Sequence, residues 1–167
     1  MRRAYPLIAS AVLVLDQITK WFVAGRFSFE TSVTVIPGLF SLVRVENRGV
    51  AFGMLSGVTS GLALTLIILV SVSALGVICY LLWKNDASAW RAGIALALIL
   101  GGAAGNLIDR IARGRVVDFL DFYFRDYHWP AFNVADSAIV VGAGLLIIDL
   151  FWGRVPQAPP RHESASN

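Results

Sequence analysis

Four apolar runs, each long enough to cross a lipid bilayer, constrain this chain more than any other feature. They cover residues 6–24, 59–83, 90–108 and 134–152. A spanning helix needs about 20 predominantly apolar residues to cross the hydrocarbon core. Hydrophobic residues make up 57% of the chain and charged residues 15%, whereas ordinary soluble domains are about 25% charged. The sequence therefore predicts an all-α membrane protein with four transmembrane helices.

The first run has an alternative interpretation as a cleavable signal peptide, because Arg2 and Arg3 precede an apolar stretch. Asp16 and Lys20 interrupt that stretch and no persuasive small-residue cleavage site follows it, so a first transmembrane helix is favoured. Four spans place both termini on one side of the membrane. The basic residues divide almost evenly between the two sides, but the arginine pair before the first span favours a cytoplasmic N-terminus.

The first long connection, residues 25–58, is expected to form a small extracytoplasmic β-sheet, or cradle. It contains two runs rich in β-branched and apolar residues, 32–36 and 39–45, separated by the turn pair Pro37-Gly38.

The second long connection, residues 109–133, is rich in phenylalanine, tyrosine and tryptophan, which indicates a segment lying in the membrane interface. Residues 153–167 contain prolines and small polar residues, and we expect them to be a disordered cytoplasmic tail. Residues 1–152 are then expected to form a single integral-membrane domain.

Two aspartates, Asp118 and Asp136, flank the polar part of the second connection. A carboxylate beside hydrocarbon is costly, by roughly 2.5–3.5 kcal/mol at a helix centre, and is a functional candidate for that reason. Two carboxylates brought together can share one proton and so provide an acid and a base at the same pH. The residues leave alternatives open, because Asp136 could form a capping box with Asn133 and Asp118 competes with Asp121 and Asp126.

Further polar residues lie within or at the ends of the spans. Asp16 and Lys20, four residues apart, could form an intrahelical ion pair with Lys20 snorkelling to the interface. The third span ends with three polar residues, Asn106, Asp109 and Arg110. Their side chains could satisfy one another's hydrogen-bonding groups, or could hold a peptide backbone and a lipid headgroup.

Small residues and glycines mark two other segments. Residues 101–105, Gly-Gly-Ala-Ala-Gly, permit close approach of helices. Residues 47–53 form a polar loop whose glycines allow unusual backbone angles.

Other kinds of functional site lack the residues that they would need. With only two histidines, His128 and His162, a histidine zinc site is short of ligands. No phosphate-binding or dinucleotide-binding fingerprint occurs. The net charge of +3 is small and its basic residues are scattered, so nucleic-acid binding has little support. We therefore expect no metal, cofactor or nucleic acid.

Five segments together, spread over nearly the whole chain apart from the tail, resemble the prokaryotic lipoprotein signal peptidases, also called signal peptidase II. They occur in the family's order: residues 15–20 (Leu-Asp-Gln-Ile-Thr-Lys), 47–52 (Asn-Arg-Gly-Val-Ala-Phe), 101–110 (Gly-Gly-Ala-Ala-Gly-Asn-Leu-Ile-Asp-Arg), 116–119 (Val-Val-Asp-Phe) and 129–137 (Trp-Pro-Ala-Phe-Asn-Val-Ala-Asp-Ser). One small departure is Arg48-Gly49-Val50, where the family commonly has Thr-Gly-Ala, and it affects only fine contacts near Asn47.

The resemblance implies an aspartic endopeptidase of the bacterial cytoplasmic membrane. Such enzymes remove the signal peptide from diacylglyceryl-modified prolipoproteins by cleaving before the lipidated cysteine, near the extracytoplasmic face, and use no cofactor. By motif position, the resemblance implies that Asp118 and Asp136 are the catalytic residues. It implies substrate binding by Asn47, Asn106, Arg110 and Asn133. It implies a supporting role for Asp16, Lys20, Gly49 and Asp109. The expected partners are prolipoproteins and membrane lipids, and a monomer is expected.

Two other function classes stay open from the residues alone. A small proton-coupled transporter or lipid carrier would use Asp16, Asp136 and Asp149 as relay groups. A structural membrane subunit would use the polar motifs to hold helices together. Transport predicts acids near mid-membrane and an internal repeat, whereas Asp118 and Asp136 lie at span ends and no repeat is visible.

Overall fold

The computed structural model describes residues 3–29, 31–49, 60–86 and 88–152. It contains four helices that are long and apolar enough to cross a membrane, which confirms the four predicted spans. These are α1 (Ala4–Arg26), α2 (Ser60–Lys84), α3 (Trp90–Arg113) and α4 (Val134–Trp152). The predicted disordered tail, residues 153–167, lies outside the described residues.

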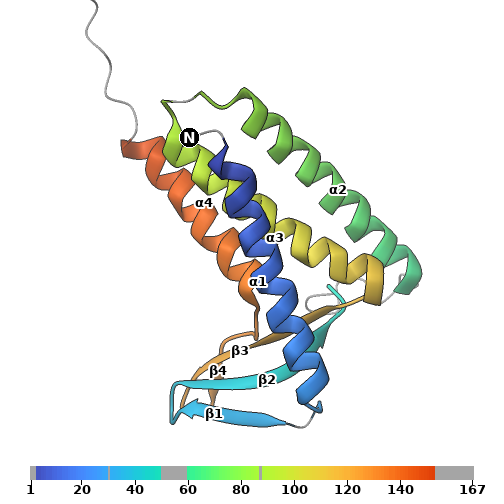
Figure 1. The fold of residues 1–167 in the computed structure, drawn as a ribbon. Helices are drawn as coiled ribbons and strands as arrows, with labels where there is room; N and C mark the ends of the chain where they lie inside the picture. Colours follow the sequence, from blue (N-terminus) through green and yellow to red (C-terminus); the bar gives the residue numbers. More distant parts are fainter. Residues whose placement is uncertain (1–2, 30, 50–59, 87, 153–167) are drawn as a thin grey trace, which may run out of the picture.

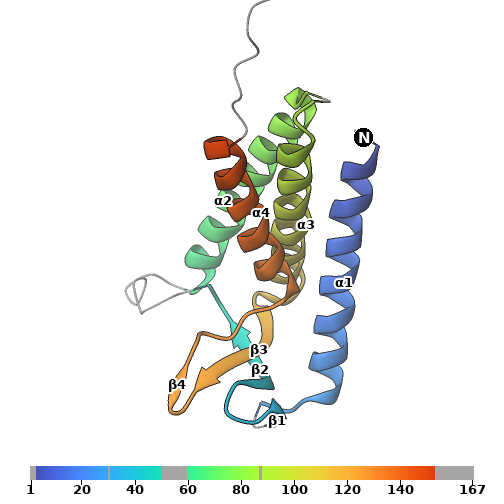
Figure 2. The same ribbon diagram turned by 90° about the vertical axis from the view of Figure 1, so that its left-hand side faces the viewer.

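Helix α3 is the central helix of the bundle and packs against α1, α2 and α4 (Figures 1 and 2). Glycines allow this close packing, as the run at residues 101–105 predicted. A Cβ at Gly101 would lie 2.5 Å from the Ala9 carbonyl oxygen of α1, and one at Gly102 would overlap the Ala135 carbonyl oxygen of α4. Larger residues at these positions would push the helices apart.

The sheet lies at one end of the bundle, opposite the end at which α1 begins and α4 ends (Figures 1 and 2). Its strands are antiparallel in the order β1 (Ser32–Ile36), β2 (Phe40–Asn47), β3 (Val116–Phe124) and β4 (Tyr127–His128). The predicted strand pair in the first connection is confirmed, and the turn between its strands has Gly38 at a φ of 78°.

The second connection supplies the other half of the sheet, β3 and β4, which the sequence analysis did not predict. Residues Val116–Phe124 are almost entirely β-branched, aromatic or leucine, a composition that favours a strand. The chain can turn into this strand because Gly114 ends α3 in the left-handed conformation, with a φ of 68°. In the register between β2 and β3, Val45 pairs with Asp118 and Asn47 pairs with Val116.

A small apolar core fastens the sheet to the bundle. Its buried members are Val23 of α1 together with Val117 and Phe119 of β3. Partly buried side chains pack around them, including Val134 at the start of α4. Neighbouring residues on a strand point to opposite faces, so this packing of Val117 and Phe119 turns Asp118 to the other face of β3.

Candidate active site

Asp118 and Asp136 are brought together by a single side chain, that of Asn133. The Asn133 Nδ2 donates to Asp118 Oδ1 at 2.7 Å. Its Oδ1 accepts from the backbone N–H of Asp136 at 2.9 Å, while Asp136 Oδ2 accepts from the backbone N–H of Asn133 at 3.3 Å. The capping box predicted for Asn133 and Asp136 is therefore present. The same amide that caps α4 also holds the carboxylate of β3.

A second amide, that of Asn106 on α3, completes the connection. Its Nδ2 donates to Asp136 Oδ1 at 2.7 Å. Its Oδ1 accepts from Asn133 Nδ2 at 3.3 Å. Each aspartate is thus held by one short amide hydrogen bond, and the two amides are bonded to each other.

Asp118 is only 2% exposed to solvent. The pKa of its carboxyl group is raised from 3.8 to about 6, chiefly by burial and also by the nearby charge of Asp136. Hydrogen bonds from the Asn47 and Asn133 side chains and the charge of Lys20 act in the opposite direction. Asp118 can therefore hold a proton near neutral pH, which an ordinary surface aspartate does not.

The two acids that competed with Asp118 occupy different environments. Asp121 is buried and bonded to His128, whose Nδ1 lies 2.9 Å and 3.0 Å from its two carboxylate oxygens. Asp126 is exposed at the tip of the β3–β4 turn. Among the described acids, Asp118 is the one on this loop that is bonded to the Asn133–Asp136 pair.

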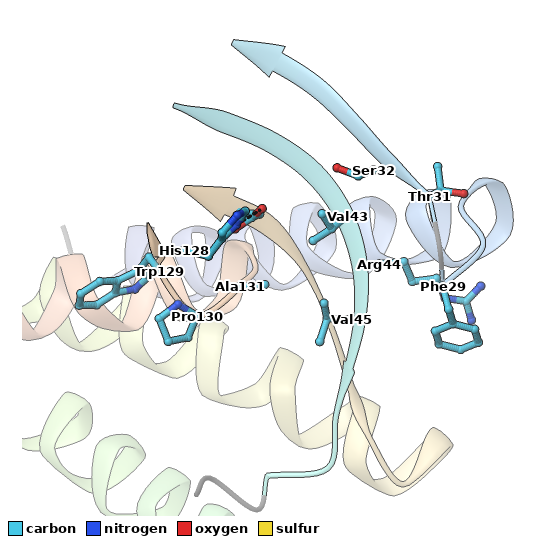
Figure 3. A pocket seen from close by; sticks show the side chains of 11 residues that line it. Phe29, Thr31, Ser32, Val43, Arg44, Val45, His128, Trp129, Pro130 and Ala131 are labelled. Atoms are coloured by element: carbon cyan, nitrogen blue, oxygen red, sulfur yellow. Dashed lines mark hydrogen bonds and ion pairs between the residues drawn. The ribbon is translucent and has the colours of Figure 1, made fainter. Parts of the chain in front are cut away.

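The Asp121–His128 pair lines a hollow of about 440 Å³ beside the sheet. Figure 3 shows His128, Trp129 and Pro130 on one side of this hollow and Val43 and Val45 of β2 on the other. Neither Asp118 nor Asp136 is among the described residues that line it. The hollow is therefore a feature of the sheet and is distinct from the carboxylate pair.

Lys20 does not snorkel to the membrane interface, which corrects that part of the sequence interpretation. The predicted ion pair with Asp16 is present, with an Nζ–Oδ2 distance of 2.8 Å, but both side chains are 0% exposed. Lys20 also pairs with Asp109 Oδ2 at 2.8 Å. A ring of partners across the bundle holds the ammonium group inside, because α1 packs directly on α3.

Asp16 and Asp109 each make a second strong contact. Asp16 Oδ1 accepts from the backbone N–H of Ala135 at 2.9 Å and so satisfies one of the unpaired N–H groups at the start of α4. Asp109 Oδ1 pairs with Arg113 at 2.9 Å. Sequence reasoning did not foresee that these acids tie α1, α3 and α4 together. The spacing of Asn106, Asp109 and Arg113 on one face of α3 was the available signal.

The remaining predicted residues lie where the loop after β2 approaches α3. Asn47 Oδ1 accepts from the backbone N–H of Gly49 at 2.7 Å, and Gly49 has a φ of 79°. A Cβ at Gly49 would lie 2.9 Å from the Ile67 side chain and 3.8 Å from Arg110 Nε. Arg110 donates to the Asn106 carbonyl oxygen at 3.1 Å, while its buried Nε has no hydrogen-bond partner among the described residues. This donor lies beside Gly49, on the loop that follows β2.

Fold and site together define a multi-pass helical membrane protein with a pair of carboxylates, one buried and one partly buried, at the sheet end of its bundle. The model of the family described as signal peptidase (SPase) II matches residues 8–152. The chain belongs to the signal peptidase II family. It is accordingly a protease of lipoprotein processing and a multi-pass protein of the bacterial inner membrane. The transporter and structural-subunit interpretations are set aside.

Several curated relatives carry the name lipoprotein signal peptidase. The protein of Solibacter usitatus (strain Ellin6076) is 50% identical over 147 residues, which cover 86% of this chain and 87% of the relative. That of Geobacter sulfurreducens (strain ATCC 51573 / DSM 12127 / PCA) is 47% identical over 157 residues, covering 94% and 97%.

Solved structures agree with this fold. One, described as a bacterial membrane enzyme determined by the in meso method at 1.9 Å resolution, has a TM-score of 0.81 and 34% identity and covers 90% of this chain and 94% of its own. A second, at 2.3 Å resolution, has a TM-score of 0.80 and 32% identity, with coverages of 93% and 94%.

Proposed function

We propose that this protease is an aspartic endopeptidase that removes the signal peptide from diacylglyceryl-modified prolipoproteins by cleaving before the lipidated cysteine. The observation that carries this proposal is the buried Asp118, joined through Asn133 to Asp136 and having a pKa raised to about 6. A pair of carboxyl groups that holds one proton contains both the acid and the base that peptide hydrolysis needs.

In the proposed reaction, Asp136 is the base and Asp118 the acid. Asp136 takes a proton from a water molecule as the water oxygen bonds to the scissile carbonyl carbon. Asp118 donates its proton to the carbonyl oxygen, which gives a neutral tetrahedral intermediate. The C–N bond then breaks, the departing nitrogen receives the proton held by Asp136, and Asp118 regains one from the intermediate. The raised pKa of Asp118 supports its role as the acid. Asp136 accepts hydrogen bonds from the Asn106 side chain and from the backbone N–H of Asn133, which hold its carboxyl group in position.

Asn106 and Asn133 are assigned to the orientation of the two carboxyl groups, because their amide N–H groups already point at Asp136 and Asp118. Arg110 is the better candidate for direct substrate binding. Its buried Nε, which lacks a described partner, can donate to a peptide or ester oxygen of the substrate. Asn47 is exposed, and its position beside Asp118 suits contact with the peptide.

The described ends of the chain lie at the end of the bundle away from the sheet (Figure 1). We place that end in the cytoplasm and the sheet with the carboxylate pair near the extracytoplasmic face, where a lipidated cysteine can reach the site without leaving the bilayer.

The test is cleavage of a synthetic diacylglyceryl-modified prolipoprotein by purified variants in detergent micelles. Asp118→Asn and Asp136→Asn should each lower kcat by about 10³-fold or more, because each removes an acid–base group. Asp121→Asn is the matched control, since Asp121 is also a buried aspartate of β3 but is bonded to His128. We expect it to retain activity.

Substantial cleavage by either Asp118→Asn or Asp136→Asn, with the protein folded, would rule out the dyad. The wild-type protein should cleave the lipidated precursor and leave its unlipidated form intact. Equal cleavage of both forms would contradict the proposed substrate class.

A further inference from the structure

The structure contains a fully buried lysine, Lys20, whose ammonium group lies among three oxygen atoms. The Lys20 ammonium group carries three N–H donors. Its nitrogen lies 2.8 Å from each of three oxygen atoms, Asp16 Oδ2, Asp109 Oδ2 and Asn106 Oδ1, and the contact with Asn106 is a hydrogen bond. Two of these contacts are ion pairs that balance charge. The third, to a neutral amide, adds nothing to charge balance and calls for another explanation.

The contact with Asn106 fixes which way that amide faces. An ammonium group only donates, so the atom of Asn106 that it meets must be the oxygen. The amide nitrogen then points the other way, and it donates to Asp136 Oδ1 at 2.7 Å. A flipped Asn106 would place an N–H against the ammonium group and its oxygen against the Asp136 carboxylate, and both contacts are repulsive.

The same oxygen continues the connection to the other aspartate. Asn106 Oδ1 also accepts from Asn133 Nδ2 at 3.3 Å, and Asn133 Nδ2 donates its other N–H to Asp118 at 2.7 Å. None of the bonds that Lys20 makes within the described residues reaches Asp118 or Asp136 directly. Its influence on either carboxyl group therefore passes through the amides or through its charge.

We propose that Lys20 is a positioning residue for peptide hydrolysis: by holding the oxygen of Asn106, it aims one amide N–H at Asp136 and lets Asn133 aim another at Asp118. This inference rests on the proposed aspartic mechanism. It assigns Lys20 a role in catalysis beyond joining α1 to α3, although Lys20 touches no reacting atom.

The charge of Lys20 has a second, measurable effect on the site. It lowers the pKa of Asp118, against burial and the Asp136 charge, which raise it. The other charged groups around Lys20 are Asp16 on its own helix and Asp109 on α3, which in turn pairs with Arg113. If the proton on Asp118 is required, activity falls as pH rises through its pKa. Loss of the Lys20 charge should therefore move this basic limb of the pH–rate profile to higher pH.

The experiment compares Lys20→Met with Arg113→Gln in the full chain. Arg113 is the matched control because it pairs with the same Asp109 but is not bonded to Asn106. Lys20→Met should lower kcat by about 10–100-fold, as expected for misplaced reacting groups. KM should stay nearly unchanged, because Lys20 does not reach the surface. Its basic limb should move to higher pH. Arg113→Gln should change neither kcat nor the pH profile.

Lys20→Met removes the cation paired with the buried carboxylates of Asp16 and Asp109, and the variant could fail to fold for that reason. A second variant keeps the inference testable in that case. Asp16→Asn with Lys20→Met removes one charge of each sign, while Asp109 keeps Arg113. The double variant should show the same loss of kcat at unchanged KM. A folded protein of either kind with kcat within about twofold of wild type would overturn the inference. Activity that survives in Asp118→Asn would instead overturn the proposed aspartic mechanism.

Discussion

The polar interior of the protein has two parts that meet at Asn106 and differ in how their charges are satisfied. The first, here called the closed cluster, consists of Asp16, Lys20, Asp109 and Arg113, with two acids and two bases in direct ion pairs. The second, the carboxylate pair of Asp118 and Asp136, is held by amides. Within the described residues, no cation is bonded directly to either of its acids.

This difference distinguishes residues that hold the helices together from residues proposed to carry out the reaction. In the closed cluster every charge has an opposite charge within 2.9 Å, and together with the Ala135 N–H the cluster joins three helices. In the carboxylate pair, burial without a cation keeps a proton on Asp118 up to a pH of about 6. The same residue type, aspartate, is therefore a structural link in the closed cluster and, in the proposed mechanism, a proton donor in the carboxylate pair.

The largest difference between the two parts is expected when the same substitution, aspartate to asparagine, is made in each. Asp109→Asn leaves Lys20 with one acidic partner and Arg113 with none among the ion pairs described. Breaking a buried ion-pair network in this way should lower the free energy of unfolding by about 3–5 kcal/mol. Reversible unfolding in mixed micelles, followed by circular dichroism, measures this loss.

Asp118→Asn is the isosteric control for that experiment. The asparagine oxygen can still accept from Asn133, and a costly buried charge is removed, so the variant should be at least as stable as wild type at pH 8 while its activity is lost. If Asp109→Asn and Asp118→Asn lost similar stability, the distinction between the two parts would collapse.

A smaller effect on stability is expected from a substitution that tests how rigidly the closed cluster is held. A Cβ at Gly105 would lie 2.5 Å from Asp16 Oδ2. Asp16 cannot turn away cheaply, because it is bonded to Lys20 and to the Ala135 N–H. Gly105→Ala should therefore cost about 1–3 kcal/mol, the usual range for overpacking.

Gly144→Ala on α4 is the matched control, since a Cβ there meets nothing within 4 Å. Alanine favours helices over glycine by up to about 1 kcal/mol, so this variant should be neutral or slightly stabilised. Thermal unfolding of both variants in one detergent provides the measurement. Equal stability of the two would mean that Asp16 is free to move.

Much of this architecture could be predicted from the sequence because the determining signals are local. The four spans follow from apolar run length, and the strand pair of the first connection follows from β-branched runs around Pro37-Gly38. The capping box of Asn133 and Asp136 is also local, since its partners are three residues apart.

The rest depends on contacts between distant segments. Asp118 and Asp121 both have apolar neighbours on β3, and only the arrival of Asn133 at one and His128 at the other distinguishes them. The spacing of Asp16 and Lys20 is equally compatible with a snorkelling and a buried lysine. Which occurs depends on whether α3 presents Asn106 and Asp109 to α1, and that packing cannot be seen in either helix alone.

The most direct test of the central claim is the titration of the Asp118 carboxyl group by carbon-13 NMR of aspartate-labelled protein, assigned by loss of its signal in Asp118→Asn. We expect a midpoint near pH 6 in the wild-type protein. We also expect a lower midpoint in Asp136→Asn, because the Asp136 charge raises the pKa of Asp118. A midpoint near the ordinary aspartate value of 3.8, or one that Asp136→Asn leaves unchanged, would contradict a coupled carboxylate pair.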